Sequence, residues 1–120
     1  MRDMSQVLER WAGWARSEHS GVDYSPIAAG FRGLLPHTSN QSQCCSDDDG
    51  LVIESCLAKL RAKRPSEHKI LVAYYFFKIS KRKIAIKENC DEKTIRVQMQ
   101  LAEGFIDGCL SMLEVKLDME

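Results

Sequence analysis

The chain has 120 residues, a length typical of one domain, and 44% of them are apolar while 28% are charged, so it can bury a core and stay in solution. Seventeen basic and seventeen acidic residues give a net charge of zero, which by itself argues against nucleic-acid binding. No apolar run approaches the roughly 18 residues of a membrane span, and "MRDMSQVLERWAGWARS" lacks the layout of a secretory signal, so we expect a cytoplasmic protein.

Residues 4–17 carry apolar side chains at the spacing of an amphipathic helix. Trp11 and Trp14 lie on this stripe, which is typical of a core or a docking surface rather than of a cofactor site. The segment "SGVDYSP" interrupts the helix, and "IAAGFRGLL" predicts a short helix that ends at Pro36. We therefore expect an N-terminal helical segment over residues 1–36.

Residues 37–50, "HTSNQSQCCSDDDG", are polar and short-side-chained, which predicts a mobile loop. The aspartates from Asp47 onward suit a helix start, because carboxylates accept from free amide groups and complement the helix dipole; this explains them better than a metal site does. A helix then continues through "LVIESCLAKLRAK" to Pro65, which stops it. Its apolar positions are Leu51, Ile53, Cys56, Leu57 and Leu60.

The next segment, "SEHKILVAYYFF", predicts another helix, with Ser66 as its cap. The run from Ile70 to Phe77 would also suit a buried strand. Its helical neighbours and the lack of a partner strand elsewhere in the sequence favour a helix.

The zero net charge is a sum of three blocks of unequal sign. Residues 1–56 carry four basic and eight acidic side chains, residues 57–87 carry ten and one, and residues 88–120 carry three and eight. A concentrated basic block is typical of a surface that binds phosphate, although a solvated basic face would show the same charge.

A helix-turn-helix pattern begins inside the basic block. Ser80 can cap a helix from about Lys81 to Glu88, in which Ile84, Ala85 and Ile86 supply apolar contacts. The turn and the next helix are marked by four further residues: Asn89 tolerates left-handed backbone, Cys90 can enter the core, Asp91 can cap, and Ile95 points inward. This spacing of a small residue, a tight turn, a cap and an inward apolar residue predicts a helix-turn-helix. A helical hairpin with a basic surface is the alternative.

With Ile95 and Met99 inward, the second helix of this motif has a polar outer side that suits base recognition. The base-reading candidates are Glu92, Lys93, Arg96, Val97 and Gln100. Arginine can pair with guanine, glutamine with adenine, and glutamate with cytosine in the major groove. The candidates for phosphate contacts are Lys81, Arg82, Lys83 and Lys87.

The chain ends with another apolar-periodic stretch, "QLAEGFIDGCLSMLEVKL", which includes Leu101 among its apolar positions. Gly104 and Gly108 are unfavourable inside a helix by about 1 kcal/mol each relative to alanine. We expect either another helix packed closely there or a kink; a self-association seam is a further alternative.

From Ser66 onward, the sequence resembles region 4 of bacterial sigma factors in three features: an aromatic helix, "KIS" before "IA", and "IR" in the second helix of the motif. Four stretches resemble the transcription antitermination protein Q family of lambdoid phages and prophages, of the short phage 21 type. They are "LERWAGWARS", "GVDYSPIAAGFRGLLP", "DDDGL" and "AEGFIDGCL". The resemblance covers most of the chain, which departs from the family pattern mainly at residues 37–46 and in "KRKIAIKEN". It implies an all-α fold in which residues 51–120 form a helical region with a sigma region 4-like helix-turn-helix at about residues 80–103, in what we expect to be one domain.

The resemblance also implies a mechanism and its partners. Such proteins bind double-stranded DNA beside the phage late promoter, meet bacterial RNA polymerase in a sigma-dependent promoter-proximal pause, and join the elongation complex. There they are expected to narrow and extend the RNA-exit channel, so that the nascent RNA passes without sequence-specific binding and cannot fold into a terminator hairpin. The resemblance places the protein in the cytoplasm of a bacterial host and allows self-association on DNA.

Other functional classes have weaker support. His19, His37 and His68 are scattered, so we expect no catalytic residues and no enzyme activity. Cys44 and Cys45 are adjacent rather than spaced as zinc ligands are; an odd count of five cysteines fits free thiols in a reducing compartment, and we expect no metal and no cofactor. The remaining alternatives are a conventional helix-turn-helix regulator that acts at initiation, and a pure protein-interaction module.

Overall fold

The computed structural model describes residues 3–19, 21–36, 43–113 and 116–117, and within these ranges the regular structure is entirely helical. The elements are α1 (Met4–Trp14), a π-helical turn (Ala15–His19), α2 (Ser25–Gly30), α3 (Asp47–Lys63), α4 (Pro65–Tyr75), α5 (Lys81–Lys87) and α6 (Glu92–Met112). The prediction of an all-α fold is confirmed. None of the described helices is both long enough and apolar enough to cross a membrane.

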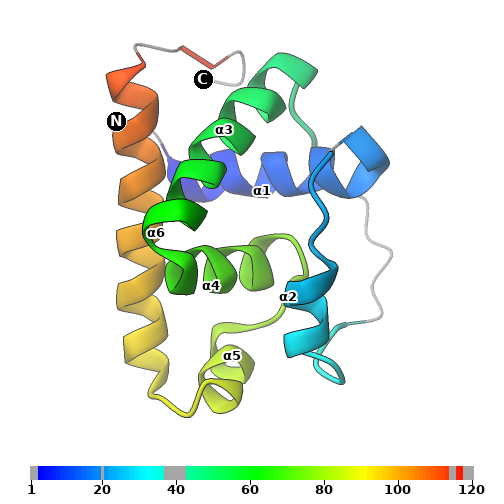
Figure 1. The fold of residues 1–120 in the computed structure, drawn as a ribbon, viewed down its shortest axis with the longest axis vertical. Helices are drawn as coiled ribbons and strands as arrows, with labels where there is room; N and C mark the ends of the chain where they lie inside the picture. The colour runs from blue at the N-terminus through cyan, green and yellow to red at the C-terminus, as the bar shows by residue number, and fades with distance from the viewer. Residues whose placement is uncertain (1–2, 20, 37–42, 114–115, 118–120) are drawn as a thin grey trace.

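Helix α6 runs along one side of the molecule for most of its height (Figure 1). Helices α1 and α4 lie across α6 one above the other, and α3 contacts α1, α4 and α6. Helix α5 lies at one end of the molecule, below α4 and beside the first turns of α6. This arrangement leaves the N-terminal half of α6 at an end of the molecule rather than in its centre.

The N-terminal segment is part of the same core as the other helices. Trp11 is fully buried and stacks edge-on against Tyr24, with ring centroids 6.2 Å apart. Trp14 packs on the first turn of α3, where its indole Nε1 donates a hydrogen bond of 2.8 Å to Asp47. Gly50 is buried beneath the Trp14 ring, and an added Cβ there would lie 2.6 Å from Cε3 of that ring. The absence of a side chain at Gly50 is therefore what allows α1 and α3 to approach.

One predicted helix boundary at this end of the chain is wrong, and another is confirmed. Helix α2 ends at Gly30 rather than at Pro36, because the backbone turns through Gly33, whose φ is +89°. Helix α3 begins at Asp47, where the aspartates predict a helix start, so residues 47–50 of the predicted loop 37–50 are helical. Residues 37–42 of that loop, and His37 with them, lie outside the described residues.

Helix α3 begins with a serine cap and ends before a proline. The Ser46 side chain accepts a hydrogen bond of 3.2 Å from the amide of Asp49, so Ser46 is the cap and the three aspartates fill the first turn, where they favour the helix dipole. Helix α3 ends at Lys63, two residues before Pro65, as predicted. Among its predicted apolar contacts, Leu51 differs, because 56% of it is exposed.

Helix α4 is confirmed as a helix, but Ser66 is not its cap. The helix begins at Pro65, whose missing amide hydrogen and restricted φ suit the first helical position. At its other end, Arg16 Nη1 donates to the carbonyl oxygens of Tyr75 and Phe76 at 2.9 and 3.0 Å. These bonds satisfy carbonyls that have no partner inside a helix, and they tie the N-terminal segment to α4.

Helix α6 continues without interruption for 21 residues. The expectation that Gly104 and Gly108 permit close packing of another helix, or a kink, is wrong: both are exposed, and an added Cβ would have no neighbour within 4 Å. Leu101 was expected to pack inward, but 51% of it is exposed. The C-terminal half of α6 therefore has an open outer side.

The five cysteines all lie in described residues, and none of them forms a disulfide bond. Cys56 is fully buried, whereas Cys44 is exposed, so these two do not share a surface site. Burial, followed by the nearby Asp49 carboxylate, raises the pKa of the Cys45 thiol to about 11. A thiol with a raised pKa is a poor nucleophile at neutral pH.

Candidate nucleic-acid interface

The first helix of the predicted motif, α5, begins at a serine cap. The Ser80 hydroxyl accepts a hydrogen bond of 3.2 Å from the amide of Lys83, as the sequence predicts. The link from α4 passes through Lys78, whose φ of 58° is left-handed. This conformation turns the chain so that Ile79 is buried directly before α5 begins, and no sequence signal pointed to it because lysine has no preference for left-handed backbone.

The turn between α5 and α6 is set by Asn89. Its φ of 56° is left-handed, as predicted from the tolerance of asparagine for this region. The amide of Cys90 donates to the carbonyl of Ala85 at 3.0 Å, and the amide of Asn89 donates to that of Ile86 at 3.3 Å. These two bonds form the Schellman arrangement that ends helices after a left-handed residue, and they direct the chain from α5 into α6.

The two helices pack through the residues that the motif predicts, with two exceptions. Ile84, Ala85, Ile95 and Met99 are buried, while Cys90 is half-buried against the core. Ile86 was expected to supply a contact, but it is 69% exposed. Asp91 occupies the cap position of α6, yet its side chain makes no capping hydrogen bond.

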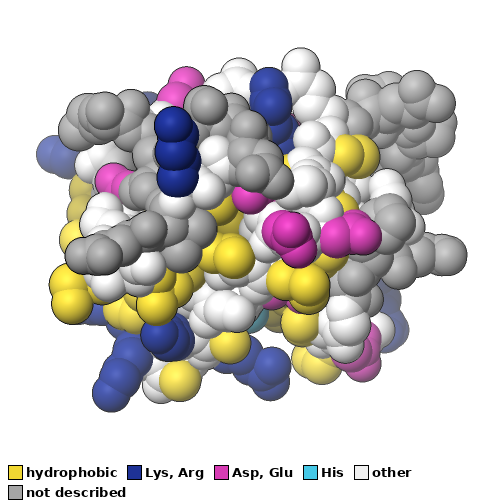
Figure 2. All heavy atoms as spheres, turned by 90° about the horizontal axis from the view of Figure 1, so that it is seen from above, with side chains coloured by type: hydrophobic (Ala, Val, Ile, Leu, Met, Phe, Trp, Pro, Cys, Tyr) yellow, Lys and Arg dark blue, Asp and Glu magenta, His cyan; other side chains and the backbone are white. Residues whose placement is uncertain are grey.

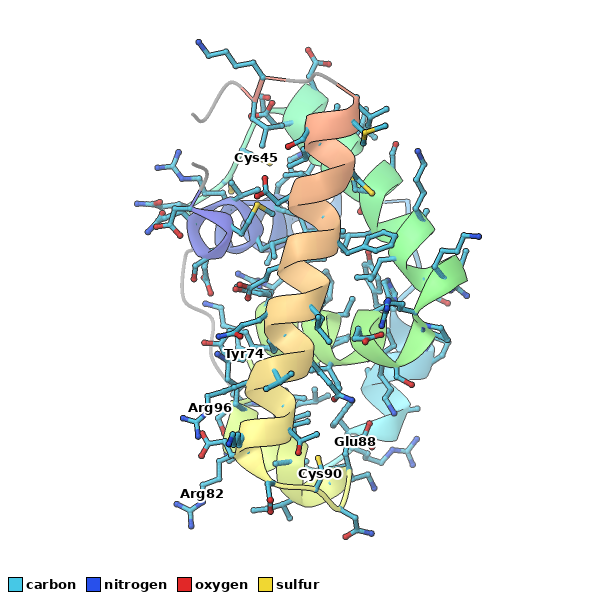
Figure 3. All side chains as sticks on the ribbon, turned by 90° about the vertical axis from the view of Figure 1, so that its left-hand side faces the viewer. Cys45, Tyr74, Arg82, Glu88, Cys90 and Arg96 are labelled. Carbon is cyan, nitrogen blue, oxygen red and sulfur yellow. The ribbon has the colours of Figure 1, made fainter. Side chains whose placement is uncertain are left out.

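The outer side of α6 is open along its N-terminal half. The five base-reading candidates, Glu92, Lys93, Arg96, Val97 and Gln100, are all exposed. Figure 3 shows Arg96 projecting to the same side of the molecule as Arg82 of α5, whereas Glu88 and Cys90 lie on the other side of the first turns of α6. The structure thus brings the reading candidates together on one accessible face; that they contact bases stays a prediction.

The four phosphate candidates lie on α5 beside this face. Arg82, Lys83 and Lys87 are exposed, and Lys81 is half-buried. The Lys81 ammonium lies over the ring of Tyr74, 5.1 Å from its centroid. Cationic side chains beside an accessible helix suit contacts with a phosphate backbone that borders a groove.

Glu88 departs from the apolar residue usual at its position in a helix-turn-helix, and the structure gives the reason. Its carboxylate forms an ion pair with Lys69 of α4. The pair attaches the end of α5 to α4, and it removes one acidic group from competition with phosphate. Gln98 also stands where many such motifs carry an apolar residue, and it is half-buried at the side of α6.

Two residues near the reading face were missed by the sequence analysis. Thr94 is exposed on the first turns of α6, and helical periodicity alone could have placed it there. Tyr74 belongs to α4, and its place beside Lys81 depends on how α4 and α5 pack, which no local pattern reports.

The end of the molecule opposite α5 has a different character. Hydrophobic, basic and acidic side chains are interspersed on its visible face (Figure 2). The concentration of basic side chains beside an exposed helix therefore distinguishes the α5–α6 end from this one.

Comparison with known proteins identifies the same family as the sequence motifs. The family model of phage antitermination protein Q matches residues 1–118. "Probable antitermination protein Q" of Acyrthosiphon pisum secondary endosymbiont phage 1 is 51% identical over 120 residues, which cover 99% of this chain and 81% of that protein. "Antitermination protein Q" of Escherichia phage 933W is 43% identical over 121 residues, which cover 100% of this chain and 83% of that protein.

A relative encoded by a bacterial genome and a solved structure are also similar. "Prophage antitermination protein Q homolog QuuD" of Escherichia coli strain K12 is 40% identical, with 100% of this chain and 94% of that protein covered. The solved structure of transcription antitermination factor Q21 has a TM-score of 0.60 at 18% identity and covers 92% of this chain and 89% of that one. At this identity, the likeness to the solved structure concerns the fold.

Proposed function

The chain belongs to the phage antitermination protein Q family, and from this premise we propose that it uses its helix-turn-helix to bind double-stranded DNA beside a phage late promoter. In the cytoplasm of the bacterial host, it then loads onto RNA polymerase that is held, with its sigma factor, in a promoter-proximal pause. Once part of the elongation complex, it lets the polymerase read through pauses and terminators.

The proposed means of read-through is steric. A small helical protein at the RNA-exit channel would extend and narrow the path of the transcript. RNA in a narrow passage cannot fold back on itself, so a terminator hairpin cannot form. The nascent RNA passes without sequence-specific binding, and the N-terminal and middle helices provide the contacts with polymerase and RNA.

The observation that carries the proposal is the exposure of the outer side of α6. A recognition helix must present its side chains to base edges without obstruction from the rest of the protein. All five reading candidates are exposed, and Ile95 and Met99 fix the opposite side of the helix in the core. The basic residues of α5 supply the electrostatic attraction to phosphate.

The proposal includes self-association of two copies on DNA. The exposed glycines Gly104 and Gly108 leave room for a close neighbour on α6, and a shallow groove of about 480 Å³ runs beside them. Its other lining residues are Lys59, Phe105, Cys109, Met112 and Leu113. We expect sedimentation to give two proteins per DNA site, and Gly108→Leu to reduce this to one; two copies bound by the variant would contradict the role of this groove.

Transcription of a template with a terminator far downstream of a late promoter tests the main proposal. Read-through that persists after polymerase has left the DNA site supports antitermination. Enhanced initiation without read-through would instead indicate a conventional regulator, and would overturn the proposal. A template without the DNA site upstream of the start is the matched control, since loading should require it.

A further inference from the structure

Two adjacent tyrosines at the end of α4 have opposite environments. The Tyr75 side chain is buried, and its hydroxyl donates a hydrogen bond of 2.8 Å to Glu103 Oε2. Tyr74 is half-buried, and no residue of the described ranges forms a hydrogen bond with its hydroxyl. One phenol is thus used inside the fold, while the other remains available to an external acceptor.

Tyr74 is held in position from two sides. Its ring lies edge-on to that of Tyr75, with centroids 4.9 Å apart and planes at 85°. The second contact is with Lys81, whose ammonium lies 5.1 Å from the centroid of the Tyr74 ring, within the range of a cation–π interaction. The interaction restrains a side chain that would otherwise be flexible, and it keeps the positive charge beside the phenol.

The pair borders the reading face. Lys81 is the first residue of α5, and Figure 3 shows Tyr74, Arg96 and Arg82 following one another down the same edge of the molecule. A duplex lying against α6 would therefore have a phosphate backbone along this edge. Phosphate oxygens accept readily from both phenol and ammonium groups.

We propose that Tyr74 of α4, which lies outside the helix-turn-helix, and Lys81 of α5 together form a two-donor clamp for one DNA phosphate. The inference rests on the proposed function, because it requires DNA against α6. The phenol contributes a directional hydrogen bond without charge, and the ammonium contributes charge. The clamp fixes the register of the duplex relative to α6 and carries no sequence information.

Binding of a labelled random-sequence duplex of about 30 base pairs, and of a late-promoter duplex of equal length, tests the clamp. Tyr74→Phe removes only the hydroxyl and preserves the ring beneath Lys81. We expect it to weaken binding to both duplexes by about tenfold, with an unchanged dependence on salt, since no charge is lost. Lys81→Gln should weaken both and flatten the log–log salt slope by about one unit.

Tyr75→Phe is the matched control, since it removes the same atom from the neighbouring residue. We expect it to lower the resistance to urea while leaving DNA affinity unchanged. Wild-type affinity in Tyr74→Phe would overturn the clamp, as would a change in only one of the two duplexes. If the wild type binds neither duplex, or if Arg96→Ala leaves late-promoter binding intact, the proposed function fails instead, so the two failures are distinguishable.

Discussion

The left-handed turn at Asn89 makes a testable prediction about the joint between the two helices of the helix-turn-helix. A β-branched residue at this position would carry the full steric cost of left-handed backbone, whereas glycine carries none. The matched substitutions are therefore Asn89→Val and Asn89→Gly.

The expected magnitudes follow from the observed φ of 56° and from the two hydrogen bonds that close the turn. Left-handed backbone costs a non-glycine residue roughly 1–2 kcal/mol, so Asn89→Val should lower the free energy of unfolding by about that amount. For a urea dependence of about 2 kcal/mol per molar, the unfolding midpoint falls by roughly 0.5–1 M. Asn89→Gly should remain within about 0.5 kcal/mol of the wild type, because relief of strain offsets the greater freedom of the unfolded chain.

Urea denaturation followed by circular dichroism measures both variants, and DNA affinity is measured under conditions where both are folded. We expect weaker DNA binding for Asn89→Val, since part of the strain is relieved by moving the start of α6, and near-normal binding for Asn89→Gly. Equal stability of the valine variant and the wild type would refute the left-handed turn on which the geometry of the motif depends.

Three further predictions concern packing, protonation and charge. Gly50→Ala should destabilise the protein by about 1–3 kcal/mol, because its Cβ would lie 2.6 Å from Cε3 of the Trp14 ring. Gly104→Ala, whose Cβ meets nothing within 4 Å, should instead stabilise the protein by up to about 1 kcal/mol; a loss of stability in both variants would refute the assigned contact. Burial and nearby Arg61 lower the pKa of His68 to about 4, so between about pH 6.5 and pH 4 the unfolded state binds a proton at His68 that the folded state does not bind. The contribution of neutral His68 to the free energy of unfolding is therefore complete above about pH 6.5 and is lost as the pH falls towards 4. Wild type should therefore lose about 2 kcal/mol more than His68→Phe over that interval in urea titrations, and parallel pH profiles would contradict this. Replacing the four basic residues of α5 by glutamine should flatten the salt slope of DNA binding by roughly 3–4 units; an unchanged slope between low and high salt would exclude α5 as the phosphate-binding helix.

Local rules of sequence predicted the helix-turn-helix well. Helical periodicity placed Ile95 and Met99 in the core, and the serine at position 80 caps α5 as its hydroxyl chemistry suggests. The left-handed Asn89 followed from its side-chain type and its position between two apolar patterns. Each of these inferences depends on residues only a few positions apart.

The errors arose where tertiary contacts decide the structure. The spacing of Gly104 and Gly108 suggested a packed helix, but no element of the described chain covers them. Conversely, the sequence placed Gly50 in a polar loop, and only the packing of Trp14 from α1 against it explains why a glycine is needed there. Ser66 is not the cap because α4 begins at Pro65, with Arg64 at the cap position, whereas the sequence analysis treated Pro65 only as a helix stop.

The candidate site shows the same division. The exposed face of α6 could be listed from periodicity, because one buried stripe defines the opposite side. The ion pair between Lys69 and Glu88, and the placement of Lys81 over Tyr74, join α4 to α5 and could not be predicted from spacing. Family resemblance supplied the function that no local pattern carries.

Charge reversal on the outer side of α6 tests the central claim most directly. In Lys93→Glu combined with Arg96→Glu, both changed residues are exposed, so the fold should persist, as circular dichroism can verify. Gel shifts on late-promoter DNA should show binding by the wild type and none by the folded double variant. Unchanged binding by that variant would mean that α6 does not read the duplex.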